Sequence, residues 1–195
     1  KTLVEELHKQ YAKTYGTNTV PMNAETAQDT NEFGEENTNS EAIKTVGVFV
    51  NETLDNLVTI AKEANLDALQ LHGDEDEAFI QALKEKTDVE VWKAVQIRSS
   101  EDAEAWIDSS ADMLLFDAYH KDERGGTGEV FDWSCLDEFE RPFMLAGGID
   151  STNVARAIRT VRPYGIDISS GIETNGVKDD EKIKAFTNIV RTIAH

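Results

Sequence analysis

Two short turns in the C-terminal half of the chain consist of glycine and serine, which suits them to binding an anion. Gly147-Gly148 follows the apolar run Phe143–Ala146, and Ser169–Gly171 follows a second apolar segment. Turns of this kind expose backbone N–H groups, and a helix that begins beside them adds a positive dipole. The candidate phosphate ligands are the backbone amides and hydroxyls of Gly147, Gly148, Ser169, Ser170 and Gly171. The alternative is that both segments are ordinary tight turns.

Three titratable side chains stand where apolar segments end. They are His72, Asp117 and Asp167. If these segments are parallel strands, their carboxyl ends meet at one edge of the sheet, where barrel folds place catalytic groups. Each residue also has a structural interpretation. Asp117 can cap a helix, His72 can bond to backbone, and Asp167 can be a buried structural carboxylate or can orient the substrate.

The elements that must position these residues are short apolar runs that alternate with amphipathic stretches. The predicted strands are Val46–Val50, Ala68–Leu71, Val89–Ala94, Met113–Phe116, Phe143–Ala146 and Ile166–Ile168. The predicted helices are Thr53–Ala64, Glu75–Lys86, Ser100–Asp108, Asn153–Val161 and Asp179–Ile193, with a shorter one at Trp133–Phe139. Strands that are apolar throughout are expected in a parallel sheet, because helices cover both of its faces.

The spacing of these units predicts the fold class. Strand-helix units that repeat at roughly 20 to 25 residues favour an α/β fold of the eight-stranded (β/α)8 TIM-barrel type over a doubly wound open sheet. Six units lie in residues 45–195, which predicts the third strand through the eighth helix of such a barrel. Residues 1–44 then form an atypical segment in which the first two units are replaced or missing. The whole chain is predicted to be one domain.

The N-terminal segment differs in composition from the rest. Residues 1–16 have the pattern of a short amphipathic helix, whereas residues 18–40 are dominated by Asn, Thr, Glu, Asp and Gln. Such a polar tract buries too little apolar area to offset the entropy of ordering it. Residues 1–44 are therefore predicted to be partly flexible.

Composition restricts the partners. The chain has 195 residues and a formal net charge of −19, which opposes binding to nucleic acid or to anionic lipid. Its sequence holds no apolar run long enough to cross a bilayer. The single Cys135 excludes an internal disulfide, so a cytoplasmic location is expected. The acidity also fits a high-salt habitat.

Seven motifs, in this order, resemble the phosphoribosylanthranilate isomerase family over residues 45–195. They are Val46-Gly-Val-Phe-Val-Asn51, Leu69-Gln-Leu-His-Gly-Asp-Glu75, Leu114-Leu-Phe-Asp117, Gly125-Gly-Thr-Gly128, Phe131-Asp-Trp133, Leu145-Ala-Gly-Gly148 with Asn153-Val154, and Asp167-Ile-Ser-Ser-Gly-Ile-Glu173 with Lys178-Asp179. The resemblance implies a (β/α)8 barrel enzyme of tryptophan biosynthesis. Such an enzyme converts N-(5-phosphoribosyl)anthranilate into 1-(2-carboxyphenylamino)-1-deoxyribulose 5-phosphate. It uses no metal or organic cofactor, and association with other enzymes of the pathway is a further expectation.

The resemblance also implies roles for particular residues. The reaction needs an acid that protonates the furanose ring oxygen and a base that removes the C2′ proton. The family match makes Asp117 the acid. Gly125 and Gly126 belong to a loop that can close over the site and exclude water, or to an ordinary connection.

The base is the unresolved part of this resemblance. The family's base is a cysteine in a Lys-x-Cys-Gly motif on the first strand, and this sequence contains no such motif. Cys135 is expected to pack a helix against the barrel. Three explanations stay open: an N-terminal portion is omitted or replaced, another residue is the base, or catalysis has been lost. The last makes the chain a non-catalytic or impaired phosphate-binding barrel or an assembly partner. A separate alternative for the function is another sugar-phosphate barrel enzyme, such as a histidine-pathway isomerase. The motifs at 125–128 and 131–133 argue against it.

Overall fold

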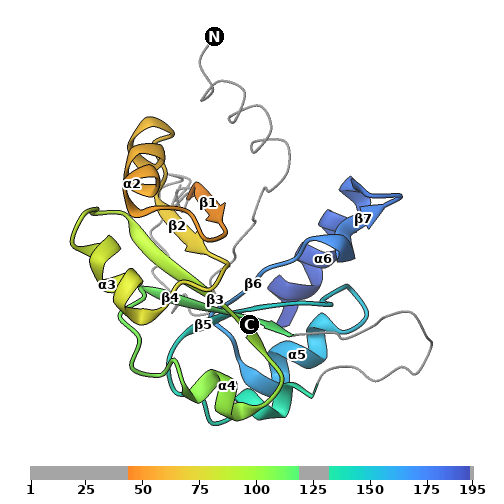
Figure 1. The fold of residues 1–195 in the computed structure, drawn as a ribbon. Coiled ribbons are helices and arrows are strands. Elements are labelled where there is room, and N and C mark those ends of the chain that lie inside the picture. Colours follow the sequence, from red (N-terminus) through yellow and green to blue (C-terminus); the bar gives the residue numbers. More distant parts are fainter. Residues whose placement is uncertain (1–43, 119–131, 194–195) are drawn as a thin grey trace, which may run out of the picture.

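The computed structural model describes residues 44–118 and 132–193, and Figure 1 shows their arrangement. Six strands form one parallel sheet. They are β1 (Val46–Phe49), β2 (Ala68–Leu71), β3 (Glu90–Ile97), β4 (Met113–Ala118), β5 (Phe143–Ala146) and β6 (Gly165–Ile166). Helices follow the strands as α2 (Leu54–Glu63), α3 (Glu77–Lys84), α4 (Ser100–Glu104), the 3-10 helix η1 (Trp133–Leu136), α5 (Val154–Val161), η2 (Ser170–Ile172) and α6 (Asp180–Ile193).

The strand order identifies the type of sheet. Each strand pairs with the next strand along the chain, in the order β1-β2-β3-β4-β5-β6, and every pair is parallel. A doubly wound sheet contains a point where this order reverses, whereas a barrel wall does not. The described part of the chain is therefore a TIM-barrel-like α/β fold.

Side-chain caps explain where several helices begin. Asp76 accepts a hydrogen bond from the Phe79 amide at 2.8 Å at the start of α3, and Thr53 does the same for Asn56 at the start of α2. Ser99 and Asp102 form a capping box at the start of α4. Each cap satisfies an amide that has no partner within its helix. The caps thus fix the residue at which each amphipathic helix begins, and the apolar side of the helix packs on the sheet.

Alternation along the strands separates two apolar clusters. The outer cluster lies between sheet and helices, and it includes Phe116 and Phe143, whose ring centroids lie 5.1 Å apart. The inner cluster is smaller and comes from the other face of the strands: Ala94, Leu115, Met144 and Ala146, with Met113 packed against them. A side chain at an inner position therefore faces the barrel interior, and one beyond the end of that strand faces its mouth.

The predicted elements agree closely with the observed ones. All six strands are present, and β2 and β5 have the predicted bounds. The predicted strand Ile166–Ile168 is shorter, because the chain leaves the ladder after Ile166 and turns at Ser169 (φ −121°, ψ −83°). The sequence analysis missed the hairpin β7 (Glu173–Thr174) and β8 (Val177–Lys178). The interpretation of residues 1–44 falls almost wholly on residues outside the described part.

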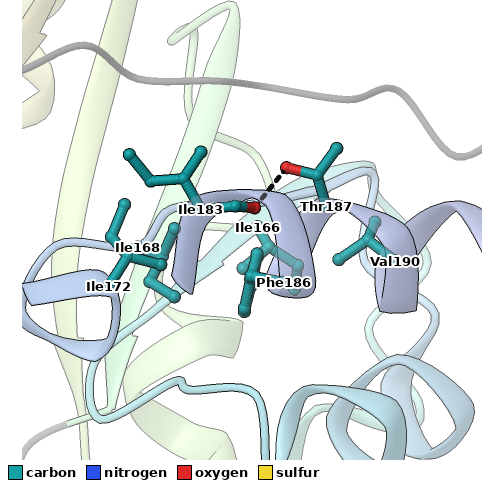
Figure 2. Close-up of a pocket in the computed structure, with 7 residues that line it drawn as sticks. All are labelled: Ile166, Ile168, Ile172, Ile183, Phe186, Thr187 and Val190. Atoms are coloured by element: carbon teal, nitrogen blue, oxygen red, sulfur yellow. Dashed lines mark hydrogen bonds between the residues drawn. The ribbon is translucent and has the colours of Figure 1, made fainter. Parts of the chain in front are cut away.

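An apolar crevice separates α6 from the end of β6, and Figure 2 shows its lining. It is lined by Ile166, Ile168, Ile172, Ile183, Phe186, Thr187 and Val190. The Thr187 hydroxyl donates to the Ile183 carbonyl at 2.9 Å, so the one polar side chain is already bonded within the helix. The crevice has a volume of about 20 Å³, which leaves room for little more than one water molecule. This crevice is a packing seam.

Arg141 holds the loop between α4 and β4 in place by hydrogen bonds to its carbonyl groups. Its guanidinium donates to the carbonyls of Ser109 (2.7 Å), Ile107 (3.3 Å) and Ala111. Arg141→Met leaves these carbonyls unpaired, so we expect the free energy of unfolding to fall by about 2 kcal/mol in urea titrations. Arg159→Met, on the exposed face of α5, is the control and should change it by under about 0.5 kcal/mol. An equal loss in both variants would contradict the assignment.

Within residues 44–118 and 132–193, the structure contains no helix with the length and apolar character needed to span a bilayer.

Candidate active site

A cavity of about 310 Å³ lies at the carboxyl ends of five strands. Its lining comes from the ends of β1, β2, β4, β5 and β6 and from the turns that follow them. The lining residues are Val48, Gln70, His72, Asp117, Ala146, Gly147, Gly148, Ile149, Asp167, Ile168, Ser169 and Ser170. This is the end at which (β/α)8 barrels carry their active sites.

His72 and Asp117 lie close together in the lining of this cavity. His72 Nε2 lies 3.8 Å from Asp117 Oδ2, which is too long for a direct hydrogen bond. Both side chains are about one third exposed. Gln70 Nε2 lies 3.4 Å from His72 Nδ1. Because an amide nitrogen only donates, this contact is a hydrogen bond in the tautomer whose Nδ1 accepts and whose proton lies on Nε2, the nitrogen that faces Asp117.

Asp167 is the second carboxylate of the cavity. It follows β6, and its backbone amide donates to the Leu145 carbonyl at 2.8 Å. Burial raises the pKa of Asp167; His72 opposes that shift, Asp117 adds to it, and Lys178 opposes it. The neutral form of this carboxyl is therefore favoured more than in water, and a neutral carboxyl can donate a hydrogen bond.

The turn after β5 depends on two glycines. Gly147 and Gly148 have φ values of 84° and 60°, a backbone region that side-chain-bearing residues rarely adopt. Asn153 holds the turn, since its Nδ2 donates to the Gly148 carbonyl at 2.8 Å and its Oδ1 accepts from the Asp150 amide at 2.9 Å. Within the described residues, the amides of Gly147 and Gly148 donate to no other protein group. They are available to an anion.

The turn after β6 packs directly against the first turn. A Cβ atom placed on Gly171 would lie 2.1 Å from the Ile149 carbonyl oxygen, so the two backbones touch at this point. Ser170 and Gly171 open η2, and the first amides of such a helix have no partner within it. Lys178 Nζ donates to the Ser169 carbonyl at 2.8 Å and lies 3.2 Å from its hydroxyl.

The structure thus brings together nearly all of the residues singled out from the sequence. His72, Asp117, Asp167 and four of the five candidate phosphate ligands line one cavity, and Gly171 abuts its wall. Gly125 and Gly126 lie outside the described residues. The sequence analysis missed Gln70, Asn153 as a turn clamp, and the role of Lys178. Gln70 was open to detection, because it stands two residues before His72 and so shares its face of the strand.

Cys135 lies in η1 and packs against the outer cluster, away from the cavity lining. Burial raises the pKa of its thiol, and the charge of Asp132 adds to this shift. A thiol of this kind is a poor proton acceptor. In the described part of the chain, no group of three or more His, Cys, Asp or Glu side chains is placed to hold a metal ion.

A family model described as N-(5'phosphoribosyl)anthranilate (PRA) isomerase matches residues 4–189. The chain belongs to this family. PRA isomerases from Endomicrobium trichonymphae and a Thermoanaerobacter species are 45% and 48% identical to it over 153 residues, which is 78% and 77% of this chain and 75% and 74% of those relatives.

Solved PRA isomerases share the architecture. The enzyme from Thermotoga maritima is similar with a TM-score of 0.67 and 35% identity, over 77% of this chain and 74% of that one. A PRA isomerase in complex with reduced 1-(o-carboxyphenylamino)-1-deoxyribulose 5-phosphate is similar with a TM-score of 0.64 and 32% identity, over 77% and 72% of the two chains. The chain thus shares its TIM-barrel-like α/β fold with solved PRA isomerases.

Asp167→Asn tests whether the ionised Asp167 carboxylate destabilises the folded state. Since the pKa of Asp167 is raised in the folded state, its destabilising effect appears as pH rises above the unfolded-state pKa and is complete above the folded one. We therefore expect Asn to raise Tm by a few degrees at pH 8, and by less near pH 4, close to the ordinary pKa of an aspartate. Thermal melts at both pH values check this. The exposed Asp108→Asn should show no such pH-dependent gain, and an equal gain from it would contradict the assignment.

Proposed function

We propose that this protein is a phosphoribosylanthranilate isomerase. In this proposal it converts N-(5-phosphoribosyl)anthranilate into 1-(2-carboxyphenylamino)-1-deoxyribulose 5-phosphate, as an intramolecular aldose-ketose isomerase of tryptophan biosynthesis. The observation that carries the proposal is the shared cavity, in which Asp117 and His72 lie with the two glycine- and serine-rich turns. Membership in the PRA isomerase family supports the choice of substrate.

The phosphate group is assigned to the two turns. The amides of Gly147, Gly148, Ser170 and Gly171 and the hydroxyls of Ser169 and Ser170 can surround it, and Lys178 beside Ser169 adds a positive charge. Dipoles at the turns suit a protein of net charge −19, which carries few cations. Phosphate held here fixes one end of the substrate, so its sugar ring extends toward β2 and β4.

Proton transfer is assigned to the carboxylate and imidazole groups at that end. Asp117 protonates the furanose ring oxygen, which opens the ring to a Schiff base. Loss of the C2′ proton then gives an enolamine, which becomes the ketose. Besides Asp117, the titratable side chains that line the cavity within the described residues are His72 and Asp167, and either can take up a proton. Asp167 in its neutral form can also donate to a sugar hydroxyl.

The position of each unit in the barrel follows from the same proposal. β1 to β6 are taken as the third to eighth strands of a (β/α)8 barrel, because phosphate-binding turns of barrels commonly follow the seventh and eighth strands. Residues 1–44 are taken as the atypical counterpart of the first two units. Location in the cytoplasm and association with other enzymes of tryptophan biosynthesis belong to the proposal as well.

Direct assay tests this function. Purified protein is incubated with N-(5-phosphoribosyl)anthranilate at low and at high salt, and the isomeric product is separated by chromatography. Turnover above the uncatalysed rate is expected. Binding of a product-like phosphate without any turnover would reject the isomerase and would favour a non-catalytic phosphate-binding barrel.

A further inference from the structure

A buried ion pair lies behind the cavity wall, on the helix-facing side of the sheet. Lys93 Nζ lies 2.9 Å from Glu75 Oε2, and the two side chains are 3% and 2% exposed. Lys93 stands between Val91 and Val95 on the outer face of β3, and its ammonium lies 5.7 Å from the centre of the Trp106 ring. Neither residue lines the cavity.

The remaining bonds of this pair go to backbone at the mouth of the barrel. Glu75 Oε1 accepts from the Asn51 amide at 2.7 Å, and Oε2 accepts from the Gly73 amide at 2.9 Å. Lys93 Nζ donates to the Gly73 carbonyl at 2.6 Å. Both polar groups of Gly73 are therefore held by the ion pair, and the turn after β1 is tied to the same carboxylate.

The turns after β1 and β2 are in close contact at this point. A Cβ on Gly73 would lie 2.3 Å from Asn51 Oδ1 and 2.8 Å from the Asn51 amide nitrogen. Asn51 adopts a left-handed φ of 53°, and its side chain exchanges two hydrogen bonds with Asp74, at 2.7 and 3.1 Å. The backbone after β2 thus has little freedom to move.

His72 is the residue that this arrangement holds. It precedes Gly73 directly, and its own amide donates to the Phe49 carbonyl at 2.8 Å. Its Nε2 lies 3.8 Å from Asp117 Oδ2. A shift of the Gly73 backbone therefore moves the imidazole relative to Asp117, and a displacement near 1 Å can change a rate by roughly 100-fold.

A gain in folding stability does not by itself explain why the chain carries a buried ion pair here. Taking two charges out of water costs several kcal/mol per ion, and apolar residues of similar size often stabilise a core as well or better. Burial alone raises the pKa of Glu75, but hydrogen bonds from Lys93 and from the Asn51 amide outweigh it and hold that pKa below its usual value. The carboxylate is therefore ionised where it accepts three hydrogen bonds.

We propose that the Glu75–Lys93 pair positions His72 against Asp117 for catalysis. This inference rests on the isomerase function proposed above. Glu75 and Lys93 are positioning residues, because they reach the reacting groups only through the backbone of Gly73.

The test uses Lys93→Met in the full chain. The NMR signals of the His72 ring nitrogens, identified by their loss in His72→Asn, are expected to shift. We expect kcat to fall about tenfold, with KM changed by less than about twofold, because the phosphate turns are untouched. In the His72→Asn background, Lys93→Met is expected to cause no further loss of kcat, since both changes act through the same group.

Two further variants keep the test decisive if Lys93→Met fails to fold. Glu75→Gln keeps the shape and removes the charge, and Gly73→Ala moves the same backbone without touching either charged side chain. Both are expected to shift the His72 signals. Lys86→Met is the matched control, because Lys86 pairs with Asp55 on the surface and should leave the signals and kcat unchanged.

Unchanged His72 signals in the folded variants, or losses of kcat that multiply in the His72→Asn background, would overturn the proposal. The NMR arm does not need turnover. If the wild-type chain is inactive while the His72 signals still respond, the isomerase function fails and the positioning by Glu75 and Lys93 stands.

Discussion

Asp117→Asn is expected to lower kcat about 1,000-fold, the largest effect of any single substitution proposed for this chain. The amide has the shape of the carboxyl but cannot deliver a proton to the ring oxygen. Asp117 stands opposite Gln96 and Ala146 in the sheet, so the variant should keep its backbone position and its phosphate contacts. KM should therefore change by less than about threefold. Steady-state kinetics with N-(5-phosphoribosyl)anthranilate measure both constants.

The control for this result is Asp88→Asn, which makes the same chemical change at an exposed position. It should retain wild-type kcat and KM. A kcat for Asp117→Asn within about threefold of wild type would remove Asp117 from proton transfer. In that event the acid would have to be sought elsewhere in the cavity, and His72 and Asp167 would be the first candidates.

Gly171→Ala is expected to separate the two turns that we propose to bind phosphate. The new methyl group would lie 2.1 Å from the Ile149 carbonyl oxygen and 3.1 Å from the Asp150 Cα, so one backbone has to move by about 1 Å. The amides of the two turns then no longer point at the same phosphate position. We expect KM to rise about 30-fold and the affinity for a product-like phosphate, measured by calorimetry, to fall by a similar factor. The change in kcat should be smaller.

Gly176→Ala provides the control for that substitution. Gly176 lies in the hairpin between β7 and β8, and a Cβ there would meet nothing within 4 Å. Its φ of 76° makes alanine locally strained, but the strain stays in an exposed turn. Phosphate affinity should be unchanged. Equal losses in the two variants would show that the affinity does not depend on contact between the turns.

Local patterns in the sequence were sufficient for the six parallel strands and for many of the residues that line the cavity. Short apolar runs such as Ala68–Leu71 and Phe143–Ala146 are typical of strands that are covered on both faces, as in a parallel sheet, so they predicted the strands. The glycines at 147 and 148 signalled a turn with positive φ, which the backbone shows. His72 and Asp117 were placed at strand ends by position alone. These inferences succeeded because each depends on a few neighbouring residues.

Contacts between distant segments were beyond that kind of reasoning. The hairpin β7–β8 is only two residues per strand, too short for an alternating pattern to register. In the sequence, Lys93 resembled an ordinary strand residue and Glu75 the start of a helix. They lie 18 positions apart, so no local pattern indicated that they form an ion pair. Arg141 likewise reaches carbonyls about 30 residues away.

The sequence by itself determined the order of the six parallel strands and their helices, the two glycine- and serine-rich turns and the carboxylate at the end of β4, because these are properties of local composition and spacing. Only the tertiary structure decided that the turns touch at Gly171, that His72 Nε2 lies 3.8 Å from Asp117, and that a buried ion pair holds the backbone beside it. The physical reason is that distances between strand ends depend on sheet register and on the packing of side chains from several elements. No single segment encodes them.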